Sequence, residues 1–174
     1  MVIVLTGVCG AGKTTIGRLL ARKLSARFYE GDAYHSRDAI DKMADNIPLT
    51  DGDRQPWLAA LQQLIRVHSR RGDTVIISCS ALKQSYRDFL CRAGRDVRFV
   101  LLRGEYDLIF KRLTQRRGHF ATKDLLASQF AILEEPATGL VVDVAAAPRE
   151  IVEIIRRRLE ISADHNQPTG TETR

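Results

Sequence analysis

Short apolar runs alternate with longer amphipathic stretches along most of this 174-residue chain. Runs rich in β-branched residues, too short for helices, predict strands at 2–6, 27–32, 73–81, 97–104 and 139–145. Apolar residues three and four positions apart predict helices at 13–24, 36–44, from between 51 and 56, 86–92, 106–116, from about 122, and 148–161. Such alternation implies an α/β fold, with a parallel sheet covered by helices on both faces.

The length and composition are those of one globular domain, with 44% hydrophobic and 28% charged residues. We predict a single domain over residues 1–162 and a disordered tail over 163–174, where no apolar pattern continues. No apolar run approaches the roughly 20 residues that span a bilayer, so no membrane partner is expected. Three cysteines without metal spacing indicate reduced thiols, and we therefore expect a cytoplasmic location.

Residues 7–14, "GVCGAGKT", match the phosphate-binding pattern G-x-x-x-x-G-K-[ST]. The segment follows a predicted strand and opens a predicted helix, which is the context that this motif requires. Its glycines allow successive backbone N–H groups to face a phosphate, and the helix N-terminus adds positive potential. We expect Lys13 to reach the β- and γ-phosphates of ATP and the Thr14 hydroxyl to ligate Mg²⁺.

The acidic residues indicate a small-molecule kinase rather than a motor or a switch. The strand at 73–81 ends without the carboxylate that a motor or switch places there, whereas Glu30 and Asp32 stand at the end of the strand at 27–32. Being two residues apart, the two side chains could share one face; one could hold the metal through water and the other could orient or deprotonate an acceptor hydroxyl. Alternatively, Asp32 caps the next helix and Glu30 is solvated.

An arginine and two histidines each have two interpretations. Arg54, near the start of the long predicted helix, suits bidentate capture of a substrate carboxylate, or it forms a surface ion pair with Asp51 or Asp53. His35 and His119 are candidates for a catalytic or binding role, or they are structural or helix-capping residues.

Six blocks in order carry a resemblance to a known family, over Val2 to about Ile161. They are "GVCGAGKTT", "EGDAYH", "KMADNIPLTDGDRQPWL", "SCSALKQSYRDFL", "RLTQRRGHF" and "LLASQFAILEEP". Together they resemble the gluconokinases of the shikimate-kinase-like P-loop group. The resemblance implies ATP-dependent phosphorylation of D-gluconate at its 6-hydroxyl with Mg²⁺, in a homodimer. It also implies a three-layer P-loop kinase fold with a five-stranded parallel sheet and a mobile lid at about 112–124. A kinase of another small hydroxy acid, such as shikimate, or a nucleotide-binding regulatory module without turnover are the alternatives.

The resemblance also assigns expected roles to residues. Expected at the catalytic centre are Lys13, Asp32 and Arg116. Expected at ATP are Gly7, Val8, Cys9, Gly10, Ala11, Gly12, Lys13, Thr14, Thr15, Arg112 and Arg116. Expected at the substrate are Asp32, His35, Arg54, Lys83 and Arg87, with Arg54 on the carboxylate. Expected at the metal are Thr14 and, through water, Glu30. Capping of a helix C-terminus is the alternative for Arg116, and for Arg117 the lid and the cap are equally open.

The chain departs from the family pattern at two positions and is basic. Glu30 stands where the family usually has Asp, and Cys9 where it usually has Ser. A thiol in a helix-N-terminal loop could have a lowered pKa, and its oxidation could then inactivate the enzyme. The net charge of +6 lies partly around the proposed anionic ligands, and Arg156–Arg158 is interpreted as a solvated helix end, so no nucleic-acid partner is expected.

Overall fold

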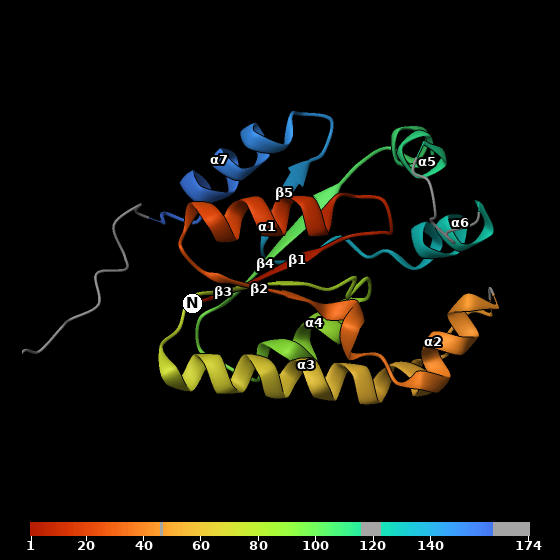
Figure 1. Ribbon diagram of the computed structural model, residues 1–174, viewed down its shortest axis with the longest axis horizontal. Coiled ribbons are helices and arrows are strands. Elements are labelled where there is room, and N and C mark those ends of the chain that lie inside the picture. The colour runs from red at the N-terminus through yellow and green to blue at the C-terminus, as the bar shows by residue number, and fades with distance from the viewer. Residues whose placement is uncertain (46, 116–122, 162–174) are drawn as a thin grey trace, which may run out of the picture.

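The computed structural model describes residues 1–45, 47–115 and 123–161, and these residues form an α/β fold around one parallel sheet (Figure 1). The strands lie in the order β2-β3-β1-β4-β5, and all four neighbouring pairs are parallel. The strands are β1 (Val2–Thr6), β2 (Arg27–Glu30), β3 (Val75–Ser78), β4 (Val97–Arg103) and β5 (Leu140–Asp143). All five predicted strands are confirmed, with shorter bounds than the sequence suggests for β2, β3 and β5.

The central strand β1 explains why two layers of helices are needed. Because successive side chains of a strand point to opposite faces, Val2 and Val4 enter one apolar core while Ile3 and Leu5 enter the other. All four are fully buried. A strand that is apolar on both faces requires cover on both, which is typical of parallel sheets.

Helices form the two outer layers, as Figure 1 shows for α1 and α7 on one side and α3 and α4 on the other. The helices are α1 (Lys13–Lys23), α2 (Arg37–Ala44), α3 (Asp51–Arg71), α4 (Gln84–Cys91), α5 (Tyr106–Thr114), α6 (Lys123–Ile132) and α7 (Pro148–Arg158). The three-layer fold is therefore confirmed. None of these helices is both long and apolar enough to cross a bilayer within the described residues.

The longest helix, α3, begins where the sequence predicts and has a strong start signal. The Thr50 side chain accepts the Asp53 backbone N–H at 3.2 Å, and the Asp53 carboxylate accepts the Thr50 backbone N–H at 2.9 Å. This reciprocal capping satisfies two N–H groups that a helix N-terminus otherwise leaves unpaired. Because α3 begins at Asp51, Pro56 lies in the second turn rather than the first.

One prediction about local geometry is wrong. Glu30 ends strand β2, but Asp32 lies in a 3₁₀ turn, Gly31–Tyr34, that follows directly. The alternation of a strand therefore does not relate the two carboxylates. Asp32 does not cap α2 either, since the N-cap of that helix is Ser36, whose hydroxyl accepts the Ala39 N–H at 3.3 Å.

Candidate active site

The loop between β1 and α1 has the backbone geometry of a phosphate cradle. Gly12 is the N-cap of α1 with φ 92°, a left-handed conformation that favours glycine. Gly7 has φ 134°, and a Cβ there would lie 2.7 Å from the Leu102 carbonyl oxygen, so a side chain has no room. The loop thus packs against β4 on one side and presents its N–H groups and the α1 N-terminus on the other.

Lys13 is the charged group of this loop. Its ammonium donates to the carbonyl oxygens of Gly7 and Val8, both at 2.9 Å, and the residue is only 9% exposed. The positive charge is therefore held within the loop, where an anion bound to the loop N–H groups would meet it.

A cavity of about 460 Å³ opens in front of the loop and joins it to the predicted acceptor residues. Cys9, Lys13 and Thr14 line one part, and His35 and Arg54 line another. Both predicted carboxylates, Glu30 and Asp32, also line it, together with residues of the α2–α3 connection and of α6. The fold thus brings most of the sequence-predicted site residues to one cavity at the carboxyl ends of β1, β2 and β3.

Glu30 is not merely solvated. The Ser78 hydroxyl donates a short hydrogen bond to Glu30 Oε1, and it accepts the Gly31 backbone N–H at 3.3 Å. Ser78 is the last residue of β3 and pairs in register with Glu30. The neighbouring strand end therefore holds this carboxylate in place.

A ring stack forms the wall next to Asp32. The imidazole of His35 lies parallel to the indole of Trp57, with centroids 4.5 Å apart and planes at 10°. Trp57 is fixed by a hydrogen bond of 2.8 Å from its Nε1–H to the Gly31 carbonyl oxygen. Burial lowers the pKa of His35 below its usual range, and its buried Nδ1 has no partner among the described residues. His35 therefore presents a neutral imidazole to this part of the cavity at neutral pH.

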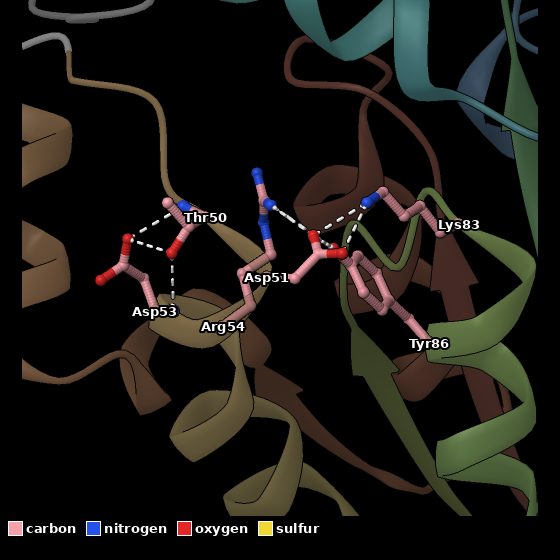
Figure 2. A network of polar contacts seen from close by, with 6 residues as sticks. All are labelled: Thr50, Asp51, Asp53, Arg54, Lys83 and Tyr86. Carbon is pink, nitrogen blue, oxygen red and sulfur yellow. Dashed lines mark hydrogen bonds and ion pairs between the residues drawn. The ribbon is translucent and has the colours of Figure 1, made fainter.

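Arg54 also lines this cavity and takes part in a polar network (Figure 2). Its Nη1 donates to Asp51 Oδ1 and to the Tyr86 hydroxyl oxygen, each at 3.4 Å. The predicted surface ion pair with Asp51 is therefore present, and Arg54 faces the cavity as well. Lys83, in contrast, does not line the cavity; its ammonium donates to both carboxylate oxygens of Asp51 at 2.8 Å.

Arg87 does not line the cavity either, contrary to the expectation of a substrate ligand. Its guanidinium donates to the carbonyl oxygens of Ala81 and Leu82 at 3.0 Å and of Glu134 at 2.9 Å. The residue is 2% exposed. Arg87 thus ties the β3–α4 loop to the segment before β5, a structural position that explains why its charge is buried.

A second cavity of about 350 Å³ lies on the other side of the loop. Gly10, Gly12 and Thr15 line it, together with Arg112 and residues of the β5–α7 connection. The Arg112 guanidinium donates to the Val144 carbonyl oxygen at 2.8 Å, which places it at the edge of this cavity. Its position beside the phosphate loop suits the nucleoside part of a nucleotide. The other predicted lid residues, Arg116, Arg117 and His119, lie outside the described residues.

Gln129 of α6 is a site residue that the sequence reasoning did not single out. Its Oε1 accepts the Cys9 backbone N–H at 2.6 Å, and both residues line the main cavity. The block "LLASQFAILEEP" contributes to the family resemblance as a whole, but a lone Gln on a predicted helix has no spacing that separates it from a surface residue.

The expectation of an acidic Cys9 thiol is wrong. Burial raises its pKa above the usual range, and the positive charge of Lys13 lowers it by less. Cys9 is therefore a protonated thiol at neutral pH, and its position in the loop does not by itself make it reactive.

The donor set fits a Mg²⁺ ion that arrives with phosphates. No cluster of three or more His, Cys, Asp or Glu side chains able to hold a metal occurs among the residues that the structure describes. Mg²⁺ commonly keeps several waters and takes one or two protein oxygens besides substrate phosphates. The Thr14 hydroxyl and the Glu30 carboxylate, which line the same cavity as Lys13, could supply them.

A phosphate loop with its lysine, and an arginine that lines the same cavity, define a P-loop kinase of small molecules. Residues 9–160 match the family described as Shikimate kinase. A probable gluconokinase of Mus musculus is 43% identical over 153 residues, covering 78% of this chain and 83% of that protein. The thermoresistant gluconokinase of Escherichia coli is 42% identical, covering 82% and 84%. The solved gluconokinase of Sinorhizobium meliloti has a TM-score of 0.79 at 40% identity, covering 91% and 94%. The chain belongs to the gluconokinase family, within the wider shikimate kinase-like group.

Proposed function

We propose that this protein transfers the γ-phosphoryl group of ATP to the 6-hydroxyl of D-gluconate, giving 6-phospho-D-gluconate and ADP. One observation carries the proposal: the phosphate loop with Lys13, the acceptor-side residues Asp32 and His35, and Arg54 all line one cavity. A linear sugar acid carries the two groups that these residues suit, a hydroxyl for Asp32 and a carboxylate for Arg54. The family membership supports gluconate over shikimate, since the relatives compared above are named gluconokinases.

The donor end acts through position and charge. Gly7 to Thr15 hold the phosphates through backbone N–H groups, and Lys13 exchanges its two loop carbonyls for phosphate oxygens. Arg112 faces the nucleoside from the second cavity. Thr14 and, through water, Glu30 would hold Mg²⁺, which would neutralise charge on the transferred group. Arg116 is proposed to add positive charge there.

The acceptor end orients the hydroxyl. Asp32 accepts the proton of the acceptor hydroxyl, which raises the nucleophilicity of that oxygen as it approaches the γ-phosphorus. Neutral His35 is placed to hydrogen-bond a hydroxyl along the sugar chain, and Trp57 holds its ring in position. Arg54 pairs with the carboxylate at the other end of the substrate.

The reaction is tested by measuring ADP release from purified protein with Mg·ATP. D-gluconate should stimulate release by orders of magnitude, while shikimate, glucose, AMP and buffer alone should not. Stimulation by shikimate in place of gluconate would reassign the substrate, and binding of ATP without any acceptor-dependent turnover would favour a regulatory module.

The carboxylate role of Arg54 is tested by Arg54→Ala. We expect the KM for gluconate to rise about 100-fold, because a charge-assisted pair contributes roughly 1.5–3 kcal/mol, while the KM for ATP stays within twofold. Arg66→Ala is the matched control, since Arg66 lies on the same helix but contacts Gln62 and Gln63 outside the cavity. An unchanged KM for gluconate in Arg54→Ala would remove Arg54 from this role.

A homodimer and a cytoplasmic location complete the proposal. The homodimer rests on the family resemblance alone, and light scattering on the purified chain tests it. The location is supported by the cysteines Cys9, Cys79 and Cys91, which are free thiols, as expected for a reducing compartment.

A further inference from the structure

Four polar side chains meet where the first turns of α3 and α4 come together (Figure 2). The Asp51 carboxylate accepts from the Lys83 ammonium at 2.8 Å through both oxygens, and from the Tyr86 hydroxyl. Arg54 Nη1 stands 3.4 Å from the same carboxylate. Asp51 is therefore bound closely by two residues of the α4 start and only loosely by Arg54.

These side chains differ in what they face. Arg54 and Tyr86 line the main cavity, whereas Asp51 and Lys83 do not. Both cations also lie over the same aromatic ring, with the Lys83 ammonium 5.5 Å and the Arg54 guanidinium carbon 6.0 Å from the Tyr86 ring centroid. Asp51 thus neutralises mainly Lys83, and Arg54, which faces the cavity, keeps N–H donors available for a ligand.

We propose that Asp51 and Lys83 are positioning residues, whose ion pair fixes Tyr86 and Arg54 so that Arg54 alone receives the carboxylate of the acid substrate. Lys83 is then the counter-ion of Asp51 and not a second ligand of the substrate. The identity of the acid rests on the proposed function; the arrangement itself requires only a carboxylate at this end of the cavity.

The physical reason is preorganisation. Without the Asp51 carboxylate, the two cations near the Tyr86 ring would repel each other, and the Tyr86 hydroxyl would lose its acceptor. Arg54 would then sample other rotamers, and binding would have to pay the cost of ordering it. The hydrogen bonds from Lys83 and Tyr86 hold the pKa of Asp51 below its usual range, so this anion persists at neutral pH.

A competing interpretation makes the opposite prediction. Asp51 could occupy a carboxylate site formed by Arg54, Lys83 and Tyr86 that the substrate must take over. Removing the charge of Asp51 would then strengthen substrate binding, since an internal competitor disappears. If the ion pair positions Arg54, the same change weakens binding. The sign of the effect therefore separates the two.

The test compares wild type with Asp51→Asn, Lys83→Met, the double variant and Asp51→Glu. The single tryptophan, Trp57, lines the cavity, so its fluorescence during gluconate titration gives a Kd that does not depend on turnover. We expect the Kd and the KM for gluconate to rise about tenfold in either single variant, with kcat and the KM for ATP within twofold. The double variant should be no worse than either single one, because the pair acts as a unit. Asp51→Glu should recover part of the affinity.

Other results have defined meanings. A lower Kd for gluconate in Asp51→Asn would overturn the proposal in favour of competition. A Kd that rises in Lys83→Met but stays unchanged in Asp51→Asn would overturn it too, because Lys83 would then be a direct ligand. Asp96→Asn, which breaks an exposed ion pair with Arg98 on β4, is the control and should change nothing. Thermal unfolding of each variant checks that the fold persists. If wild type binds gluconate without phosphorylating it, the proposed function fails while the Kd series still decides the inference; if wild type binds no sugar acid, the inference fails too.

Discussion

At the scale of single residues, two carboxylates of one short segment have different surroundings. Glu30 is held by Ser78 at the end of the sheet, whereas Asp32 stands in a 3₁₀ turn at the cavity wall and is exposed. A general base must reach the acceptor hydroxyl, and a metal-side carboxylate must stay in place. The structure therefore fits the division of roles proposed above, with Glu30 toward the metal and Asp32 toward the acceptor.

Asp32→Asn tests that division. We expect kcat to fall by roughly 10²–10⁴, the usual contribution of a positioned acid or base, with a small change in the KM for ATP. Steady-state kinetics with gluconate measures it. Asp38→Asn makes the same charge change at an exposed position of α2 and should leave kcat unchanged. Near-normal turnover in Asp32→Asn would mean that another group orients the hydroxyl.

His35 gives a pH dependence of stability. Burial lowers its pKa in the folded protein below the ordinary value of 6.5, so the unfolded chain binds more protons between those two values. In a pH range where the unfolded state binds more protons than the folded state, the free energy of unfolding falls as the pH decreases. The free energy of unfolding of wild type should therefore drop, relative to His35→Gln, as the pH falls below about 6.5 toward the lowered pKa. Urea unfolding at several pH values measures this difference; parallel curves for the two proteins would contradict it.

At the scale of elements, Arg87 connects segments that are far apart in sequence. Its donors satisfy carbonyl oxygens of Ala81 and Leu82 before α4 and of Glu134 after α6. Because α6 also supplies Gln129 to the phosphate loop, this connection helps to set the cavity wall.

Arg87→Met should therefore destabilise the protein without changing its substrate preference. Leaving buried carbonyls unpaired should cost about 3 kcal/mol. For a chain of this length, that loss should lower the Tm by roughly 6–12 °C. Scanning calorimetry measures the loss, with the exposed Arg98→Met as control. A KM for gluconate that rises strongly at unchanged Tm would restore the expected role of Arg87 as a ligand.

The elements themselves were largely predictable because their signals are local. Strand β1 is a run of β-branched residues ended by a glycine, and α3 has both capping residues in its first turn and apolar residues three and four positions apart after it. The 3₁₀ turn at Asp32 was not predictable, since no periodicity distinguishes four such residues from a strand end. The partners of Lys83 and Arg87 were not predictable either. A basic residue near a motif looks the same whether it meets a substrate, as expected for Arg54, or a distant carbonyl, as Arg87 does.

At the scale of the whole molecule, Ile161 is 8% exposed and belongs to the apolar core cluster that also contains residues of α1 and α7. Its carbonyl oxygen also accepts from Arg156 Nη1 at 3.3 Å. From the loss of apolar pattern we predict that the domain ends at residue 162, directly after this buried side chain.

A chain ending at residue 162 should keep the Tm and the kcat of the full protein. A chain ending at residue 160 removes Ile161 and should lose stability, since a buried isoleucine contributes roughly 2–3 kcal/mol. Thermal unfolding and the ADP-release assay measure both. Loss of activity in the chain ending at residue 162 would extend the functional domain into 163–174.

The sheet order has a consequence for how the protein is made. Strand β1 is synthesised first but lies at the centre, and its partners are β3 and β4, which end at Ser78 and Arg103. The phosphate loop depends on residues that come even later in the sequence, since Gly10 packs against Ile109 and Leu113 of α5. On the ribosome, the ATP site therefore cannot form until α5 has emerged. ATP can stabilise the finished enzyme, but it cannot guide the folding of shorter nascent chains. In those chains the apolar "VIVL" segment must avoid aggregation without help from bound ATP.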